Sequence, residues 1–438
     1  MKEIGVAILG FGTVGAGVAD VLLRRSDRLA ARAGVRPVLR GIADVDVKTD
    51  RGIAVPPELL TTDAAALIAR PDVQIVVELI GGRTVAAQFI RQALDAGKSV
   101  VTANKALLAH DGAELFRRAA AHGAEIAFEA AVAGGIPIIK ALREGLIAND
   151  TDRIYGILNG TCNYILTEMT ERKLPFADAL ADAQRKGYAE ADPTLDVDGH
   201  DTAHKAAVLA TLACGAPVPL ATVAVEGIRG LSPLDIACAA ELHCRIKLLA
   251  VIRRGDEGVS VEVRPTLIPE THLLAGVGGV YNAVWAHSDV AGATFYHGRG
   301  AGRFPTASAV TADIADVARR LAQGGAPRPA AYTGDAAAVR VCPAGRLSAR
   351  HYLRLTLLDR PGALARVAEA LGRNDISIAT VVQQECSPGA PVAVILLTHA
   401  AQNCRLEKAL AEIARLDVVA APTVRLCMED FQQPTPNT

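Results

Sequence analysis

The chain has 438 residues, a length that suggests about three domains. Half of the residues are hydrophobic but only 4% are aromatic, so Ala, Val, Leu and Ile must form most of the core. The net charge of -1 gives no sign of a nucleic-acid or anionic-membrane partner. The apolar run at residues 4–9 lacks a basic leader and is too short for a signal sequence or a membrane span, so we expect a cytoplasmic protein.

The eight cysteines are scattered, without a CxxC pair and without metal-ligand spacing to a histidine. We interpret them as small buried side chains in a reducing compartment. They are Cys162, Cys214, Cys238, Cys244, Cys342, Cys386, Cys404 and Cys427.

The first motif follows a short apolar run, IGVAIL at residues 4–9, which is typical of a buried parallel strand. The run leads into GFGTVG at residues 10–15 and then a helical stretch at residues 16–32. In this setting Gly10 permits a tight turn, Gly12 lets the backbone approach a pyrophosphate, and Gly15 allows close packing of helix on strand. The free N–H groups and the dipole of the helix N-terminus favour such an anion. The candidate cofactor-binding residues here are Gly10, Phe11, Gly12, Thr13, Val14 and Gly15.

Further strand signals lie at residues 38–43, 75–80, 99–102 and 125–128, alternating with helical stretches such as 64–69 and 85–96. This alternation predicts a Rossmann-type, doubly wound parallel sheet that binds ligands at the carboxyl ends of its strands. Lys105 and Glu129 follow two of these ends. Asp44 follows another, at the spacing of a carboxylate that binds ribose hydroxyls in NAD enzymes, although a solvated aspartate at a strand end is an equally good interpretation.

The middle of the chain carries an acidic loop at residues 187–199, followed by an Ala-rich helix that ends near Cys214. Asp201 and Lys205 are four residues apart and therefore share one face of this helix. Because the helix is otherwise apolar on nearly every side, burying these two charges would be costly unless they serve a function.

Two metal sites are disfavoured in this region. A calcium loop aligned on Gly199 would place Lys205 where a bidentate glutamate is required. His200 and His204 have the spacing of some zinc ligands, but there is no HExxH pattern and no evident third ligand. A later Gly-rich turn at residues 299–303 precedes a helix that ends near Leu321, and it is either a loop near a ligand phosphate or a simple connection.

The C-terminal part begins after Gly/Pro/Ala-rich breaks at residues 324–329 and 343–346. Strand signals at 352–357, 376–382, 392–398 and 424–428 alternate with helical stretches that end near Leu371 and Ala414. This order is βαββαβ and predicts a small ferredoxin-like unit. It contains no plausible catalytic cluster, so we expect a binding or interaction module.

Taken together, these blocks resemble bacterial homoserine dehydrogenases. The matching segments are GFGTVG (10–15), NKALLA (104–109), EAAVAGGIPII (129–139), NGTCNYIL (159–166), GYAEADPTLDVDGHDTAHK (187–205) and GAGRFPTASAV (300–310). LLDRPGALARVAEAL (357–371) resembles the signature of an ACT domain. The resemblance implies a dinucleotide-binding domain at 1–135 with 305–325 packing back on it, an α+β substrate-binding and dimerisation domain at 136–304, and an ACT regulatory domain at 350–430.

The resemblance also implies an activity: the NAD- or NADP-dependent interconversion of L-homoserine and L-aspartate 4-semialdehyde in threonine, methionine and isoleucine biosynthesis. Lys105 would lie by cofactor and substrate, and Glu190 and Asp196 would bind the substrate's amino group. Asp201 and Lys205 would flank the reacting hydroxyl, with Lys205 as the proton donor.

Other ligands follow from the same resemblance. Gly300 and Gly302 would contact the cofactor. A sodium ion is expected near Glu129, with backbone carbonyls as its further ligands, from Val132, Gly134 and Ile136. We also expect a homodimer or homotetramer, and an ACT unit that binds threonine as an effector or serves only for subunit contact.

The chain departs from many relatives in one respect, because they carry an arginine near the end of the second strand that can meet the NADP 2′-phosphate. Here Asp44 and Asp46 would repel a phosphate, while Lys48 and Arg51 could still reach one, so we expect NAD or dual use. Two alternatives are an oxidoreductase for another small amino or hydroxy acid and a non-catalytic ACT-type amino-acid sensor. The acidic set argues against the first, and the intact catalytic set against the second.

Overall fold

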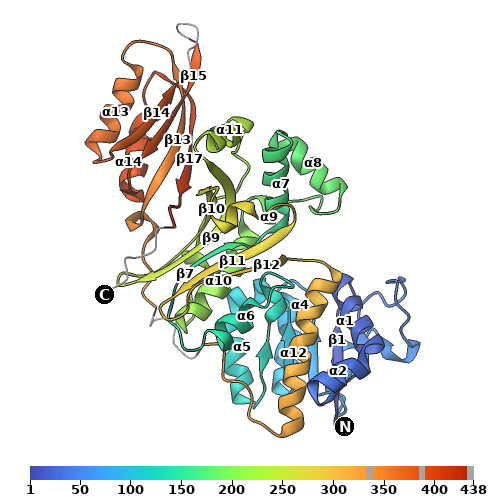
Figure 1. Cartoon of the computed structure of the whole chain (residues 1–438). Coiled ribbons are helices and arrows are strands. Elements are labelled where there is room, and N and C mark those ends of the chain that lie inside the picture. Colours follow the sequence, from blue (N-terminus) through green and yellow to red (C-terminus); the bar gives the residue numbers. More distant parts are fainter. Residues whose placement is uncertain (333–338, 384–389, 432–438) are drawn as a thin grey trace. The chain divides into compact units, whose positions relative to one another are not determined.

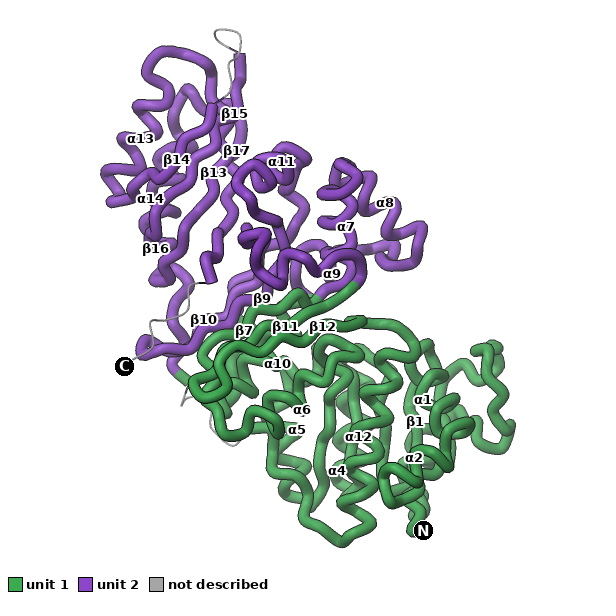
Figure 2. The backbone as a smooth tube through the Cα atoms, in the orientation of Figure 1, with its two compact units in different colours: residues 1–158, 201–221, 281–339 green, residues 159–200, 222–280, 340–438 purple. Residues whose placement is uncertain are grey.

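The computed structural model describes residues 1–332, 339–383 and 390–431. They belong to two compact units, one built from residues 1–158, 201–221 and 281–339 and the other from 159–200, 222–280 and 340–438 (Figure 2). The chain passes repeatedly between the units, so neither is a continuous segment.

The first unit contains a six-stranded parallel sheet in the order β3-β2-β1-β4-β5-β6. This is the strand order of a doubly wound dinucleotide-binding sheet, with the ligand crevice expected where the order reverses, between β1 and β4. The predicted N-terminal parallel sheet is thereby confirmed. Its strands are β1 (Glu3–Leu9), β2 (Arg36–Ala43), β3 (Leu60–Thr61), β4 (Ile75–Glu78), β5 (Ser99–Thr102) and β6 (Ile126–Ala127).

Helices α1 (Thr13–Arg24) and α2 (Ser26–Ala33) connect β1 to β2, and α3 (Ala64–Ala69), α4 (Thr84–Asp95) and α5 (Lys105–Ala121) connect the strands from β3 to β6. Figure 1 labels α1, α2, α4 and α5 around β1. The predicted helix at residues 16–32 is thus two helices, which meet at Arg25, the C-cap of α1 and the N-cap of α2. The late helix α12 (Arg303–Gln323) joins this part of the molecule: Val310, Ile314 and Val317 share one hydrophobic core with β1.

The rest of the first unit begins with α6 (Ile138–Lys140), which continues as a π-helical turn at Ala141–Gly145. Strands β7 (Thr151–Ile157), β11 (Tyr281–Ser288) and β12 (Gly292–Arg299) pair antiparallel in the order β12-β11-β7. Helix α10 (His200–Cys214) carries Asp201 and Lys205.

The second unit contains helices α7 (Gly160–Glu171), α8 (Phe176–Arg185), α9 (Thr194–Val197) and α11 (Pro233–Glu241). Its long strands β9 (Cys244–Gly255) and β10 (Gly258–Pro269) pair antiparallel, and the short β8 (Ala224–Val225) pairs with β10. The sequence analysis does not identify β9 or β10. In β10 apolar and polar residues do alternate, as Val-Ser-Val-Glu-Val-Arg at residues 259–264, but ten consecutive residues are buried, so the polar face is covered as well.

The C-terminal module follows in the same unit. It consists of β13 (Ser348–Leu358), α13 (Ala363–Arg373), β14 (Ile378–Gln383), β15 (Pro391–Thr398), β16 (Ala401–Gln402), α14 (Asn403–Ile413) and β17 (Val419–Met428). The main strands form an antiparallel sheet in the order β17-β13-β15-β14, which is the βαββαβ topology. Strand β17 also pairs with β10 through Cys427 and Met428, so the module continues the sheet of its unit.

Candidate active site

The glycine turn after β1 has the geometry that its three glycines require. Gly10 adopts φ +100°, and a Cβ on it would lie 2.6 Å from the backbone of Leu79. A Cβ on Gly15 would lie 2.0 Å from the Gly10 carbonyl oxygen, whereas a Cβ on Gly12 would meet nothing. The outer glycines are therefore needed for the turn and the packing of α1, while Gly12 leaves the backbone at the start of α1 open to a ligand.

Asp44 is tied to this turn. One of its carboxylate oxygens accepts the Phe11 N–H at 2.5 Å, and the other accepts the Asp46 N–H at 2.9 Å. The contact joins the end of β2 to the glycine turn, so Asp44 is not simply a solvated residue at a strand end. Its predicted role toward a ribose stays a prediction.

Lys105 is placed by polar residues that sequence reasoning missed. The buried Glu78, at the end of β4, accepts from the N–H groups of Ile80 and Gly81 and from the Thr102 hydroxyl. Asn104 caps α5 by accepting the Leu107 N–H at 3.0 Å, which makes Lys105 the first helical residue. Polar side chains at the ends of two apolar strands are the signal that would have identified Glu78 and Thr102.

Lys105, Asp201 and Lys205 come together in the first unit. The Asp201 carboxylate lies 2.6 Å from Lys205 Nζ and 3.3 Å from Lys105 Nζ, and thus separates the two ammonium groups. Lys205 Nζ also donates to the Leu158 carbonyl at 2.7 Å. The side chains of Asp201 and Lys205 are only 11% and 12% exposed, against 41% for Lys105. Burying an ion pair is costly and is weak evidence for a stabilising role, so these side chains are candidates for proton transfer.

The other two predicted substrate residues lie in the second unit. Asp196, on α9, accepts the Asn159 side-chain N–H at 2.7 Å, and its backbone carbonyl accepts from the Cys162 thiol at 3.1 Å. Glu190 is exposed, and its backbone carbonyl accepts from the Gln184 side chain at 3.1 Å. The sequence does not indicate that Asn159 holds Asp196, because the two residues are 37 positions apart.

The predicted cation region lies in the first unit. The buried Glu129 carboxylate accepts the N–H groups of Ile139 and Lys140 at 2.8 and 2.9 Å. Burial, with a further contribution from Asp313, raises the pKa of Glu129 to about 7. Because the carboxylate already receives two backbone donors, cation binding here would rest mainly on backbone carbonyls.

Gly300 and Gly302 flank the start of α12. A Cβ on Gly300 would collide with the Asn282 side chain, because it would lie 2.1 Å from Asn282 Cγ. A Cβ on Gly134 would likewise collide with the Gly300 carbonyl oxygen, at 2.3 Å. Asn282 is 1% exposed, and within the described residues neither of its amide atoms has a hydrogen-bond partner. The predicted cofactor and cation loops therefore meet beside an unsatisfied amide.

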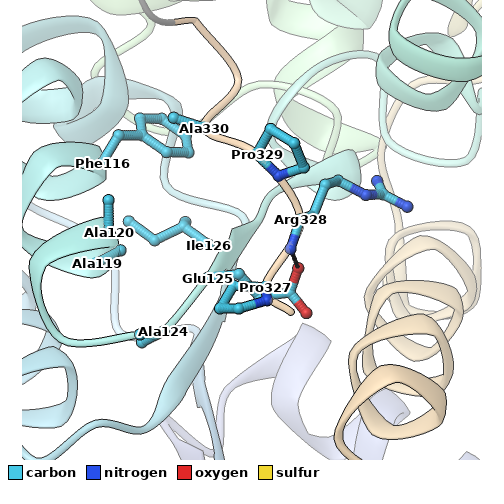
Figure 3. Close-up of a pocket in the computed structure, with 11 residues that line it drawn as sticks. Phe116, Ala119, Ala120, Ala124, Glu125, Ile126, Pro327, Arg328, Pro329 and Ala330 are labelled. Carbon is cyan, nitrogen blue, oxygen red and sulfur yellow. Dashed lines mark hydrogen bonds between the residues drawn. The ribbon is translucent and has the colours of Figure 1, made fainter. Parts of the chain in front are cut away.

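Two other findings limit where ligands bind. A cavity of about 260 Å³ lies between α5 and residues 327–330, where Glu125 accepts the Arg328 N–H (Figure 3). Glu125 precedes β6, so this cavity is at the amino end of that strand, opposite to the end where such folds bind nucleotides. In the described ranges no set of three or more His, Cys, Asp or Glu side chains could hold a metal ion, and no helix is long and apolar enough to cross a membrane.

The parallel sheet with its open glycine turn, and a lysine–aspartate pair with a second lysine in the same unit, define the class of this protein. It is a dinucleotide-dependent oxidoreductase.

Comparison with known proteins gives the family. Residues 10–129 match the family model for the homoserine dehydrogenase NAD-binding domain, and residues 137–315 match the model for homoserine dehydrogenase. The chain is 43% identical to the homoserine dehydrogenase of Neisseria gonorrhoeae over 434 residues, which cover 98% of this chain and all of the relative. A crystal structure of a homoserine dehydrogenase from Thiobacillus denitrificans superposes with a TM-score of 0.92 at 43% identity, over 98% of this chain and 99% of that one. The chain belongs to the homoserine dehydrogenase family, as its motifs predict.

A hyperthermophilic archaeal homoserine dehydrogenase, solved in complex with NADPH, is also similar, with a TM-score of 0.61 at 27% identity. The match covers 98% of that chain but 72% of this one. The family fold therefore occurs in a shorter chain than this one.

Proposed function

We propose that the chain interconverts L-homoserine and L-aspartate 4-semialdehyde with NAD or NADP, in the biosynthesis of threonine, methionine and isoleucine. The observation that carries the proposal is the half-enclosed arrangement of Lys105, Asp201 and Lys205. The bound nicotinamide would exchange a hydride with the substrate carbon that carries the reacting oxygen.

Lys205 supplies the proton in this proposal. An ammonium group has three N–H donors, and Asp201 and the Leu158 carbonyl receive two of them. The third can donate to the substrate oxygen, giving its proton as the aldehyde is reduced and recovering it as the alcohol is oxidised. Asp201 orients the ammonium group, and Lys105 adds a second positive charge that stabilises a developing alkoxide.

Glu190 and Asp196 bind the substrate's amino group, since carboxylates form strong charge-assisted hydrogen bonds with an ammonium ion. Asn159 holds Asp196 from one side at 2.7 Å and thereby sets the direction of its carboxylate. Gly10 to Gly15 and the turn around Gly300 and Gly302 bind the dinucleotide.

The first experiment measures L-homoserine oxidation at alkaline pH with NAD and with NADP, on wild type and on Lys205→Ala. We expect turnover by the wild type and a loss of about a hundredfold or more in the variant, the usual size of a general acid–base contribution. Arg24→Ala, at an exposed arginine on α1, is the matched control and should keep full activity. Absence of turnover by the wild type with either cofactor would contradict the assignment and favour the amino-acid sensor.

A monovalent cation, sodium by preference, is proposed for the turn at residues 132–136 beside Glu129. Two observations support it. Ala133 and Gly134 both have left-handed φ angles, of 55° and 54°, which turn successive carbonyls, and the nearby Asn282 amide is unsatisfied. The melting temperature should be higher in sodium chloride than in choline chloride of equal ionic strength, and equal values would contradict the site.

The C-terminal βαββαβ module is proposed to be an ACT domain that binds threonine and lowers activity. Its topology and its LLDRPGALARVAEAL segment support this assignment. Saturating threonine should reduce the rate and raise the melting temperature; if it changes neither, the module serves subunit contact alone. The homodimer or homotetramer and the cytoplasmic location stay predictions.

A further inference from the structure

Arg303 stands out because two nitrogens of its guanidinium are buried without a hydrogen-bond partner among the described residues. It is the first residue of the 21-residue helix α12, where the positive end of the helix dipole disfavours a cation. The two buried nitrogens are Nε and Nη2. The guanidinium lies 5.6 Å from the centre of the Phe304 ring. Buried donors without acceptors are costly, and an anion with several oxygen acceptors would satisfy both of them.

The side chain extends from α12 to the loop after β2. The Arg303 carbonyl oxygen and Cγ lie 2.8 and 3.0 Å from where a Cβ would sit on Gly17 of α1. Its Nη1 lies 3.9 Å from the equivalent position on Gly52. In a dinucleotide-binding sheet the loop after the second strand faces the adenosine ribose, which carries the 2′-phosphate in NADP.

The three acidic residues of that loop already accept hydrogen bonds, and Asp50 accepts the Gly52 N–H at 2.7 Å. The Asp44 carboxylate receives two backbone N–H groups, from Phe11 and Asp46. The Asp46 carboxylate accepts the N–H groups of Lys48 and Thr49 and lies 3.0 Å from the Arg51 guanidinium. The Nε atom of Arg51 is a second buried donor without a partner in the described chain.

The charge balance of the loop therefore differs from the one that its sequence suggests. The loop by itself carries the positive charges of Lys48 and Arg51 against the negative charges of Asp44, Asp46 and Asp50, and Arg303 from α12 adds the third positive charge that makes the two numbers equal. Arg303 comes from a segment about 250 residues away in the sequence, so motif reading around the second strand does not reveal it.

We propose that Arg303, assisted by Arg51, binds the 2′-phosphate of the cofactor and makes NADP the preferred dinucleotide. The inference rests on the proposed dehydrogenase function and specifies its cofactor. A guanidinium presents several N–H donors to a phosphate, so two unsatisfied donors on one side chain match this ligand. In this proposal Arg303 is a specificity residue, because it contacts the 2′-phosphate and takes no part in the proton transfer.

The test uses Arg303→Met, which keeps the apolar stem and removes the charge. Binding of 2′,5′-ADP and of 5′-ADP is measured by calorimetry, and kcat/KM is measured with NADP and with NAD. We expect the affinity of the variant for 2′,5′-ADP and its kcat/KM with NADP to fall about tenfold or more. Its affinity for 5′-ADP and its kcat/KM with NAD should change by less than about twofold. Arg303→Lys should recover part of the loss, since lysine acts as a point charge. Arg24→Met on the same unit should change neither ratio.

Several outcomes would overturn the inference. A wild type that does not distinguish 2′,5′-ADP from 5′-ADP shows no 2′-phosphate site. An equal loss with both nucleotides in Arg303→Met would place the arginine at the pyrophosphate. If Arg303→Met does not fold, Arg51→Met must show the same selective loss for NADP. In each of these cases the wild type would still oxidise homoserine with NAD, so the proposed function would stand. A wild type that binds neither dinucleotide would contradict both the proposed function and this inference.

Discussion

Asn159 illustrates how one residue can serve both the fold and the site. Its side-chain oxygen caps α7 by accepting the Cys162 N–H at 2.8 Å, and its side-chain nitrogen donates to Asp196 at 2.7 Å. We expect Asn159→Ala to lower the free energy of unfolding by about 1 kcal/mol through the lost cap and to raise the KM for homoserine. Asn159→Asp should keep the cap but set a second carboxylate against Asp196, giving the larger KM effect with the smaller loss of stability. Steady-state kinetics give the KM for homoserine, and urea denaturation gives the free energy of unfolding. Equal KM values for the two variants would contradict a role of Asn159 in holding Asp196.

Lys247, also a single residue, predicts a pH effect on stability. It is 6% exposed on β9 and donates to the Val277 carbonyl at 2.6 Å and to Asn163 at 3.2 Å. Burial lowers the pKa of Lys247 to about 8. The unfolded chain therefore keeps this proton up to about pH 10.5, while the folded chain loses it near pH 8. The free energy of unfolding consequently rises between these two pH values, and this gain is lost as the pH falls back through them.

The comparison with Lys247→Met isolates this contribution, because methionine is of similar length and does not titrate. The free energy of unfolding of the wild type should rise relative to the variant between about pH 8 and pH 10, by about 1 kcal/mol or more. A constant difference across this range would show that Lys247 titrates normally in the folded protein.

At the scale of elements, one buried ion pair joins α11 to β13. Asp235, with no exposed surface, completes a capping box with Ser232 at the start of α11. It also receives two bonds from Arg354 of β13, at 2.7 and 3.0 Å. Arg354→Leu leaves a buried carboxylate without its cation, and we expect a loss of about 3–5 kcal/mol in the free energy of unfolding.

The matched control for this pair is Arg366→Leu, which breaks an ion pair with Asp417 in the same module. Both of those side chains are largely exposed, so the loss should stay below about 1 kcal/mol. Similar losses for the two variants in guanidinium denaturation would refute the assigned importance of the α11–β13 pair.

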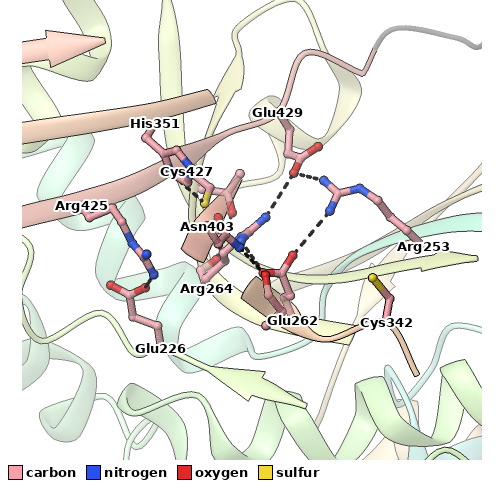
Figure 4. A network of polar contacts seen from close by, with 12 residues as sticks. Glu226, Arg253, Glu262, Arg264, Cys342, His351, Asn403, Arg425, Cys427 and Glu429 are labelled. Atoms are coloured by element: carbon pink, nitrogen blue, oxygen red, sulfur yellow. Dashed lines mark hydrogen bonds and ion pairs between the residues drawn. The ribbon is translucent and has the colours of Figure 1, made fainter. Parts of the chain in front are cut away.

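At the scale of the whole molecule, the C-terminal module depends on a charged network where β17 meets β10 (Figure 4). Glu429 pairs with Arg253 and lies 3.7 Å from Arg264, which in turn pairs with Glu262 at 2.5 Å. Arg264 is 5% exposed and has two nitrogens without hydrogen-bond partners in the described residues. Its burial is therefore supported mainly by the two glutamates.

Removing Glu429 should loosen the attachment of the module. In Glu429→Ala the charge of Arg264 is less compensated, so we expect faster hydrogen exchange along β17 and a lower melting temperature, by several degrees. Asp430→Ala is the control, because this neighbour is exposed and lies 3.4 Å from Arg350. Unchanged exchange in Glu429→Ala would show that the pairing of β17 with β10 does not depend on this network.

Much of the fold was open to prediction from local signals. Strands β1, β2, β4, β5 and β6 lie where short apolar runs predicted them, and the βαββαβ order of the C-terminal module is the predicted one. Strands β9 to β12 were missed, although β10 alternates apolar and polar residues over 259–264, and its polar face proved to be buried too. The boundaries of the three predicted domains stay a prediction, because the structure divides into two units that are each made of several chain segments.

What the sequence determined by itself acts over a few residues: the glycine turn at 10–15 and the shared face of Asp201 and Lys205. These features depend on backbone geometry and on side chains three or four positions apart, which a sequence displays directly. Only the tertiary structure decided that Asp201 also pairs with Lys105, that Asn159 holds Asp196, and that Arg303 reaches the loop after β2. These contacts join segments far apart in the chain, and packing rather than local propensity sets their geometry.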